Sequence, residues 1–232
     1  MTQAFFITGT DTSVGKTLIA TALLRLARDN GRTTLGLKPV AAGCALVNGQ
    51  WMNKDAQQLL RVSTGKPDYA TVNPLALREP MAPHIAAARE NRTIVAGELV
   101  QHCRAQLGSA DFTVIEGAGG WLVPLNDHET MADIAVGIGC PVILVTGLRL
   151  GCINHTLLTA AAIAAAGLPL AGWVANHIDP DMAVADANIA ALEQRLAAPL
   201  LGHVPYMETP DTLFASKHLR LPDPVTTGKN WR

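Results

Sequence analysis

Short apolar runs alternate with longer segments of helical periodicity along most of the chain. Residues 4–7 form one apolar run, and from residue 18 the apolar positions recur at helical spacing until Asn30 and Gly31 end the segment. A second apolar run follows directly, at residues 34–40. A strand, a helix and a strand joined this closely predict a crossover between parallel strands.

The same alternation continues toward the C-terminus. Further strands are predicted at residues 112–115, 142–146, 170–176 and, from a weaker signal, 200–204. Alanine-rich segments at residues 155–166 and 183–196 have the spacing of helices. The pattern predicts an α/β fold with a doubly wound, mainly parallel sheet and flanking helices. No repeat or linker divides residues 1–232, so we expect one domain, and no element is predicted after Met207.

Composition and charge narrow the classes of function. The chain has 232 residues, of which 49% are hydrophobic, so it can bury one sizeable core, and no apolar run approaches the length of a membrane span. The formal net charge of −1 and the even scatter of lysine and arginine provide no basic stripe for nucleic acid. The first residues lack a signal-peptide pattern, so we expect a cytoplasmic protein.

The cysteines are too scattered to suggest a structural framework. Cys44, Cys103, Cys140 and Cys152 lie far apart and form no CxxC pair. Reduced core cysteines are therefore favoured over disulfides or a zinc site.

Residues 9–17, GTDTSVGKT, end like the phosphate-binding pattern GxxxxGK[ST] but begin one residue early, with Gly9 before Thr10. An apolar strand precedes this loop, and a helix opens at Lys16 and Thr17. Backbone N–H groups around residues 14–17 would then face one spot, to which the helix dipole and the Lys16 ammonium add positive potential. We predict a nucleotide phosphate site there, with the Thr17 hydroxyl facing Mg²⁺. A plain strand-to-helix turn is the alternative.

Glu116 ends a predicted strand and precedes three glycines within four residues. An acid at the carboxyl end of a strand, beside the loop after the first strand, is where a nucleotide-bound Mg²⁺ needs a further ligand. The glycines would let the backbone approach phosphates or substrate closely. A surface acid before a tight turn is the alternative interpretation.

Three other polar positions have both a functional and a structural interpretation. Asp55 could be a metal ligand, or Asn53 or Asp55 could simply cap the helix that follows. Lys38 ends the second strand at the same edge as the phosphate loop, although strand-end lysines are commonly solvated. Gly151 and Asn154 open an alanine-rich helix whose N-terminus could receive a carboxylate or phosphate, or could be a capping motif.

Six blocks in one order resemble the dethiobiotin synthetase family over essentially the whole chain. They are GTDTSVGKT at 9–17, KPVAAG at 38–43, NPLALREPMAPHIAAA at 73–88, VIEGAGGW at 114–121, LGCINHTLLTA at 150–160 and GWVAN at 172–176. The early glycine of the loop is typical of that family. The resemblance implies a P-loop NTPase-like fold and an ATP- and Mg²⁺-dependent cyclo-ligase of biotin synthesis. Such an enzyme converts 7,8-diaminononanoate and CO2 to dethiobiotin, as a homodimer with its sites at the subunit interface.

The resemblance also implies roles for individual residues. Nucleotide contacts fall on Ser13, Val14, Gly15, Lys16, Thr17, Leu18, Asp55, Glu116, Gly117, Ala118, Gly119, Asn176, His177, Pro205, Tyr206 and Met207. The metal falls to Thr17, Asp55 and Glu116, and catalysis to Lys38, Lys16 and Thr12. The substrate would be bound by Thr12, Lys38 and Gly119 and, from the neighbouring subunit, by Gly151, Cys152, Ile153 and Asn154.

Two positions depart from the family pattern. Ser13 stands where some relatives have glutamate, and Ala42 stands where some have a substrate-contacting serine, so that contact is not carried over. Taken alone, the loop chemistry would also suit an ATPase switch that binds a protein partner, or another amide-forming ligase.

Overall fold

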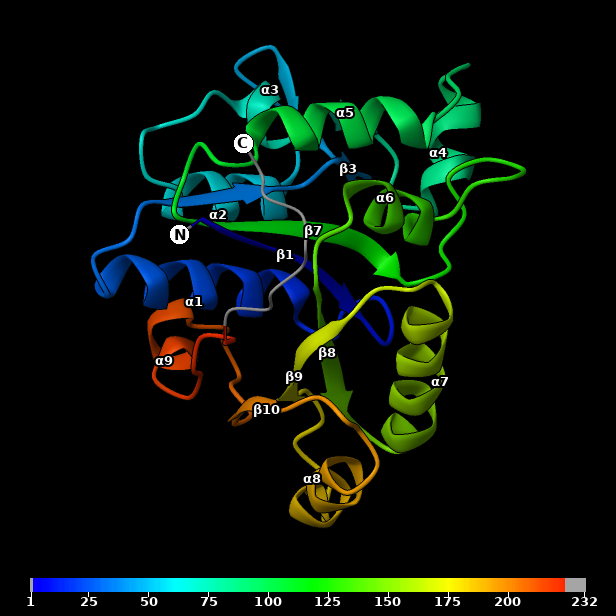
Figure 1. The fold of residues 1–232 in the computed structure, drawn as a ribbon. Helices are drawn as coiled ribbons and strands as arrows, with labels where there is room; N and C mark the ends of the chain where they lie inside the picture. Colours follow the sequence, from blue (N-terminus) through cyan, green and yellow to red (C-terminus); the bar gives the residue numbers. More distant parts are fainter. Residues whose placement is uncertain (1, 224–232) are drawn as a thin grey trace.

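The centre of the molecule is a six-stranded parallel sheet with the strand order β10-β9-β8-β1-β7-β2 (Figure 1). The computed structural model describes residues 2–223. The strands of this sheet are β1 (Gln3–Gly9), β2 (Thr34–Leu37), β7 (Phe112–Gly120), β8 (Val142–Leu148), β9 (Leu170–His177) and β10 (Leu200–Val204). Every strand predicted from the apolar runs is present, and the predicted doubly wound α/β class is confirmed.

Two strands of the main sheet end more than two residues away from the predicted position. The run at residues 34–40 does not form one strand: β2 ends at Leu37, and β3 (Val40–Ala41) pairs with β6 (Leu75–Ala76) in a separate small sheet. The Lys38 N–H donates to Val72 O at 2.7 Å and Pro39 has no N–H, so the chain leaves the main ladder there. Strand β7 continues beyond Glu116 to Gly120, which lies opposite Gly9 after an irregularity in register.

Helices cover both faces of the sheet (Figure 1). They are α1 (Lys16–Asp29), α2 (Lys54–Val62), α3 (Tyr69–Val72), α4 (Pro83–Arg89), α5 (Ala96–Gln106), α6 (Met131–Ile138), α7 (Cys152–Ala165), α8 (Ala185–Glu193) and α9 (Thr212–Ser216). Over residues 2–223, none of them has the length and apolarity needed to cross a bilayer.

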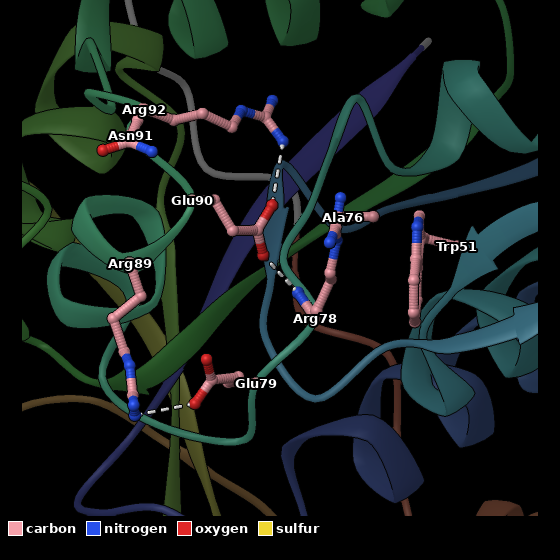
Figure 2. A pocket seen from close by; sticks show the side chains of 8 residues that line it. All are labelled: Trp51, Ala76, Arg78, Glu79, Arg89, Glu90, Asn91 and Arg92. Atoms are coloured by element: carbon pink, nitrogen blue, oxygen red, sulfur yellow. Dashed lines mark hydrogen bonds and ion pairs between the residues drawn. The ribbon is translucent and has the colours of Figure 1, made fainter.

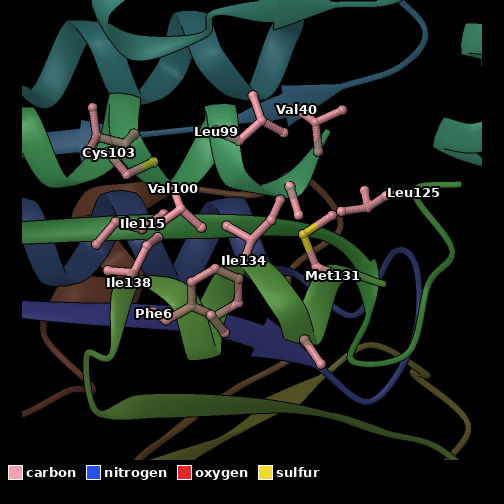
Figure 3. Packing of buried hydrophobic residues seen from close by; sticks show 14 of the residues in the cluster. Phe6, Val40, Leu99, Val100, Cys103, Ile115, Leu125, Met131, Ile134 and Ile138 are labelled. Carbon is pink, nitrogen blue, oxygen red and sulfur yellow. The ribbon is translucent and has the colours of Figure 1, made fainter. Parts of the chain in front are cut away.

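Alternation along the buried strands divides the core into two layers. In β1, Phe5 and Ile7 pack with α1 and α2, whereas Phe6 points to the opposite face and packs with residues of α5 and α6 (Figure 3). Such two-sided burial is expected of parallel strands that have helices on both faces. Because β1, β2 and β7 run parallel, their carboxyl ends lie at one edge of the sheet, where the candidate residues converge.

The features that were not predicted from the sequence include a hairpin and a helix near the end of the described chain. An antiparallel hairpin joins β4 (Ala45–Val47) to β5 (Gln50–Met52) through Asn48 and Gly49, whose φ angles of 49° and 80° suit a tight turn. Beyond Met207, helix α9 begins at Asp211, whose side chain accepts from the N–H groups of Leu213 and Phe214.

Candidate functional site: a phosphate loop and a buried lysine-carboxylate cluster

The loop between β1 and α1 offers a row of unpaired backbone amides. Within the described chain, the N–H groups of residues 13–18 have no hydrogen-bond partner, and the first paired amide of α1 is that of Ile19, to Gly15 O at 3.0 Å. Ser13 and Gly15 have φ angles of 59° and 91°, the left-handed geometry that bends successive amides into a concave surface. This loop is therefore built to receive an anion at a helix N-terminus.

Glycine at position 9, rather than position 10, follows from how the loop folds back. A Cβ on Gly9 would lie 2.5 Å from Val14 Cγ2 and 3.1 Å from both Asp11 O and Lys16 Cγ. Gly15 has a second reason to lack a side chain, because a Cβ there would collide with the amide of Asn176. The Asn176 amide donates to Val14 O at 2.9 Å and so holds the loop from β9.

Lys16 is buried at the head of this loop and has a lowered pKa. Its side chain is buried in the protein, and Nζ donates to Asp11 O at 2.9 Å. Burial, followed by the repulsion of Lys38, lowers the pKa of Lys16 from 10.5 to about 8. The ammonium is thus held without a full counter-charge of its own, which suits it to an incoming phosphate.

Glu116, Lys38, Thr17 and Asp55 meet beside the loop. Lys38 Nζ lies 2.6 Å from Glu116 Oε1 and 3.5 Å from Asp55 Oδ2, and it also donates to Gly117 O at 3.0 Å. The Thr17 hydroxyl donates to the same Glu116 oxygen at 2.8 Å. Lys38 and Glu116 are 3% and 1% exposed, so both alternatives of a solvated lysine and a surface acid are wrong. Asn53 is the cap of α2, so the Asp55 carboxylate is not used for capping.

The cluster fits a divalent cation. Glu116 Oε2 is buried and, among the described residues, has no hydrogen-bond partner. A buried carboxylate oxygen without a donor is costly unless a cation or donor completes it. Together with the Thr17 hydroxyl and the Asp55 carboxylate it forms a set of hard oxygen atoms of the type that Mg²⁺ prefers.

A buried polar chain, not predicted from the sequence, fixes Lys38 relative to Asp55. The Asn53 N–H donates to the Tyr69 hydroxyl at 2.7 Å, and that hydroxyl donates to Asn73 Oδ1 at 2.8 Å. Asn73 then donates from Nδ2 to Lys38 O at 2.6 Å. Burial raises the pKa of Tyr69 to about 12, so its hydroxyl stays neutral and serves both neighbours.

Asp11 and Arg149 form a second unpredicted link, between the loop and the segment that joins β8 to α7. The Asp11 carboxylate accepts from the Thr12 N–H at 2.7 Å and pairs with the Arg149 guanidinium. The Thr12 N–H bond and the Arg149 charge hold the pKa of Asp11 below its usual value against partial desolvation. Thr12 also lies close to Gly119, since a Cβ on Gly119 would be 3.5 Å from the Thr12 hydroxyl.

At the other end of the loop, two of the predicted nucleotide contacts, His177 and Tyr206, lie together. The His177 ring packs at 72° against Tyr206, with 6.3 Å between ring centroids, and stacks on His203 at 6.0 Å. His177 follows Asn176 in β9, and Tyr206 follows β10, whose parallel pairing aligns the two strand ends. The geometry brings these candidates within reach of the loop through the Asn176 bond to Val14.

The start of α7 offers backbone donors rather than the Cys152 thiol. Cys152 is 1% exposed, and its N–H donates to Arg149 O at 3.0 Å. A role for Cys152 in binding substrate through either group is therefore not supported. The N–H groups of Ile153 and Asn154 have no partner within residues 2–223, and Gly151 and Asn154 are exposed.

Comparisons with known proteins agree with this geometry. The family model AAA_26, described as an AAA domain, matches residues 3–212. An ATP-dependent dethiobiotin synthetase BioD from Cellvibrio japonicus (strain Ueda107) is 55% identical, with 94% of this chain and 96% of the relative covered. Its counterpart from Aromatoleum aromaticum (strain DSM 19018 / LMG 30748 / EbN1) is 50% identical, with 95% and 98% covered.

Solved structures support the fold at low identity. The septum site-determining protein MinD from Pyrococcus horikoshii OT3, complexed with Mg-ADP, has a TM-score of 0.57 at 17% identity, over 96% of this chain and 87% of that one. Cobyrinic acid a,c-diamide synthase from Mycobacterium smegmatis, with bound ATP analog and magnesium, has a TM-score of 0.57 at 14% identity, over 94% and 92%. Because the family model matches most of the chain and the two synthetases are at least 50% identical over nearly its full length, the chain belongs to the AAA_26 family and, within it, to the ATP-dependent dethiobiotin synthetases.

Proposed function

We propose that this protein uses ATP and Mg²⁺ to convert 7,8-diaminononanoate and CO2 to dethiobiotin, with release of ADP and phosphate. The observation that carries the proposal is the buried cluster of Lys38, Glu116, Thr17 and Asp55 beside the phosphate loop. The sequence is 55% identical to a relative named for this activity. A cytoplasmic location, where ATP is supplied, is part of the proposal.

Magnesium would be held by Thr17, Asp55 and Glu116, and when bound it would neutralise charge on the β- and γ-phosphates. The unpartnered Glu116 Oε2 supports this assignment. Lys38 stands between the two carboxylates, so its ammonium balances part of their charge and is near enough to serve a substrate anion. Residues 13–18 would bind phosphate oxygens through their amides, and the group around His177 and Tyr206 would face the adenine.

The chain's part in the chemistry is to position anions and to neutralise them. One substrate amine takes up CO2 and loses a proton, which gives a carbamate that Lys38 and Lys16 hold by charge. A carbamate oxygen then attacks the γ-phosphorus, the bond to the bridging β-phosphate oxygen breaks, and ADP leaves. The second amine attacks the carbonyl carbon of this mixed anhydride, loses a proton and expels phosphate as the ring closes. Thr12 and Gly119 would contact the substrate amine, and catalysis rests on orientation and electrostatics.

A homodimer is the second part of the proposal. Leu150, immediately before α7, is 96% exposed, and Leu158 on the outer side of α7 is 62% exposed. Apolar side chains of this size favour burial against a partner. In a dimer, the free amides of Ile153 and Asn154 would receive the substrate carboxylate at the neighbouring subunit's site, and the interface would shield the mixed anhydride from water.

Incorporation of labelled bicarbonate into a ureido product, measured with and without the diamine, tests the function. The proposal requires diamine-dependent ADP release with one label per product, and Lys38→Ala should lower turnover by about 10²- to 10³-fold while the fold stays intact. Diamine-independent ATP hydrolysis without labelled product would instead favour an ATPase switch. A folded Lys38→Ala variant with normal turnover would contradict the role of Lys38.

A further inference from the structure

A separate pocket lies between the β4–β5 hairpin, β6 and the end of α4 (Figure 2). Its volume is about 490 Å³, and it shares no lining residue with the phosphate loop or with the cluster around Glu116. The lining residues are Trp51, Ala76, Arg78, Glu79, Arg89, Glu90, Asn91 and Arg92. This volume falls within the range of small-molecule sites.

The pocket has more cationic groups than carboxylates, and its carboxylates are already engaged. Glu79 pairs with Arg89 at 2.8 Å. Glu90 accepts the backbone N–H of Arg78 at 2.7 Å and faces Arg92 at a looser 3.8 Å. Within residues 2–223, the Arg78 guanidinium has no carboxylate partner. Three arginines against two glutamates leave one positive charge in the cavity, and Arg78 is the group that carries it.

Trp51 holds this free guanidinium in a defined orientation. Arg78 Cζ lies 5.1 Å from the centroid of the Trp51 ring, in the range of a cation–π contact, and Trp51 is 36% exposed (Figure 2). A guanidinium placed in this way keeps its N–H groups available at its edge, where a carboxylate can accept two parallel hydrogen bonds. The rest of the indole offers a surface on which a flat ligand group can stack.

We propose that this pocket binds a small organic monocarboxylate that carries a flat ring. The carboxylate pairs with Arg78, the ring lies against Trp51, and Arg92, loosely paired with Glu90, supplies a further donor. A phosphate dianion suits the cavity less well, because Glu79 and Glu90 would oppose its second charge. The site is independent of the proposed ligase reaction, since neither its walls nor its charges come from the ATP cluster.

Benzoate is the probe for this site, with benzyl alcohol as its neutral counterpart. Calorimetric titration of the full chain should give one benzoate site per chain with a dissociation constant on the order of 1 mM, and no binding of benzyl alcohol. The Trp51 indole resonance, assigned by its absence in Trp51→Phe, should shift in ¹⁵N spectra. Arg78→Ala should weaken binding at least about tenfold. That variant keeps the backbone bond to Glu90, so the pocket wall remains.

Arg28→Ala, which removes an exposed arginine from the end of α1, is the matched control and should bind benzoate normally. Equal binding in Arg78→Ala and Arg28→Ala, or equal binding of benzoate and benzyl alcohol, would overturn the proposal. So would displacement of benzoate by 7,8-diaminononanoate, which would place it at the substrate site. Normal ligase activity in Arg78→Ala is expected and separates a failure here from a failure of the proposed function.

Discussion

Replacing Lys16 by methionine should make the unliganded protein more stable while abolishing its response to ATP. A fall in the pKa of Lys16 from 10.5 to about 8 corresponds to about 3 kcal/mol by which the folded protein disfavours the charged ammonium. Methionine has a similar length and no charge, so this cost disappears. Loss of the hydrogen bond to Asp11 O offsets roughly 1 kcal/mol of this gain in stability. We expect Lys16→Met to raise the free energy of unfolding by about 2 kcal/mol at pH 7.

The pH dependence provides the check on this reasoning. Between pH 8 and 10.5 the unfolded chain binds more protons at Lys16 than the native protein does, so the stability of the native protein rises with pH in this window. The gain in the free energy of unfolding caused by Lys16→Met should therefore be largest at or below pH 7 and shrink toward pH 10. Urea unfolding at both pH values measures it. Lys217→Met, at the exposed position that directly follows α9, is the control and should show no such change.

Two results would refute the reasoning. One is a variant that is less stable than the native protein at pH 7, and the other is a difference that does not change with pH. Mg-ATP should stabilise the native protein and the Lys217→Met variant but not Lys16→Met, because binding to the folded state alone raises stability.

Three further experiments probe the contacts around the cluster. Glu116→Gln should raise the Mg²⁺ concentration needed for half-maximal activity while the fold is kept, and an unchanged magnesium titration would count against Glu116 as a ligand. Tyr69→Phe leaves the Asn53 N–H and Asn73 Oδ1 without a partner, so the free energy of unfolding in urea should fall by about 2 kcal/mol. Turnover should also fall, because Lys38 is held less firmly. Wild-type values in both assays would contradict the role of the polar chain. A double-mutant cycle of Arg149→Ala with Asp11→Asn should give a coupling of roughly 0.5–1 kcal/mol in kcat/KM, reduced by salt because the pair is partly exposed, and strictly additive effects would remove that link.

The sheet could be predicted from the sequence because its strands are buried on both faces. Residues 142–145, for example, are all apolar, and the helix between the first two strands shows clear periodicity with a glycine stop. Lys38 and Pro39 interrupted one run in a way that periodicity alone does not resolve. The Asn48-Gly49 hairpin turn did carry a sequence signal, since this dipeptide favours the left-handed angles found there, but its strands are too short for an alternation pattern.

The residues of the candidate site that belong to a sequence motif could be predicted. Those that reach the site only through tertiary contacts could not. Lys16 and Thr17 open α1, and Glu116 lies on β7 beside β1, so the order of these elements fixes where the three residues meet. Tyr69 and Asn73, in contrast, act through hydrogen bonds to residues 16 and 35 positions away, and no local pattern indicates such partners. Asp11 lies inside the loop motif, but its pairing with Arg149, far along the chain, depends on the pairing of β8 with β1, which brings the end of β8 next to the loop.

We propose that Thr17, Asp55 and Glu116 share one divalent cation on an ATP triphosphate beside Lys16 and Lys38. A crystal structure of the protein with Mn²⁺ and a non-hydrolysable ATP analogue, with the metal located by its anomalous signal, tests this most directly. The metal should lie next to Glu116 Oε2 and the Thr17 hydroxyl, with the phosphates on the amides of residues 13–18 and Lys16 Nζ turned to the γ-phosphate. A metal bound elsewhere, or phosphates that do not contact the loop, would contradict it.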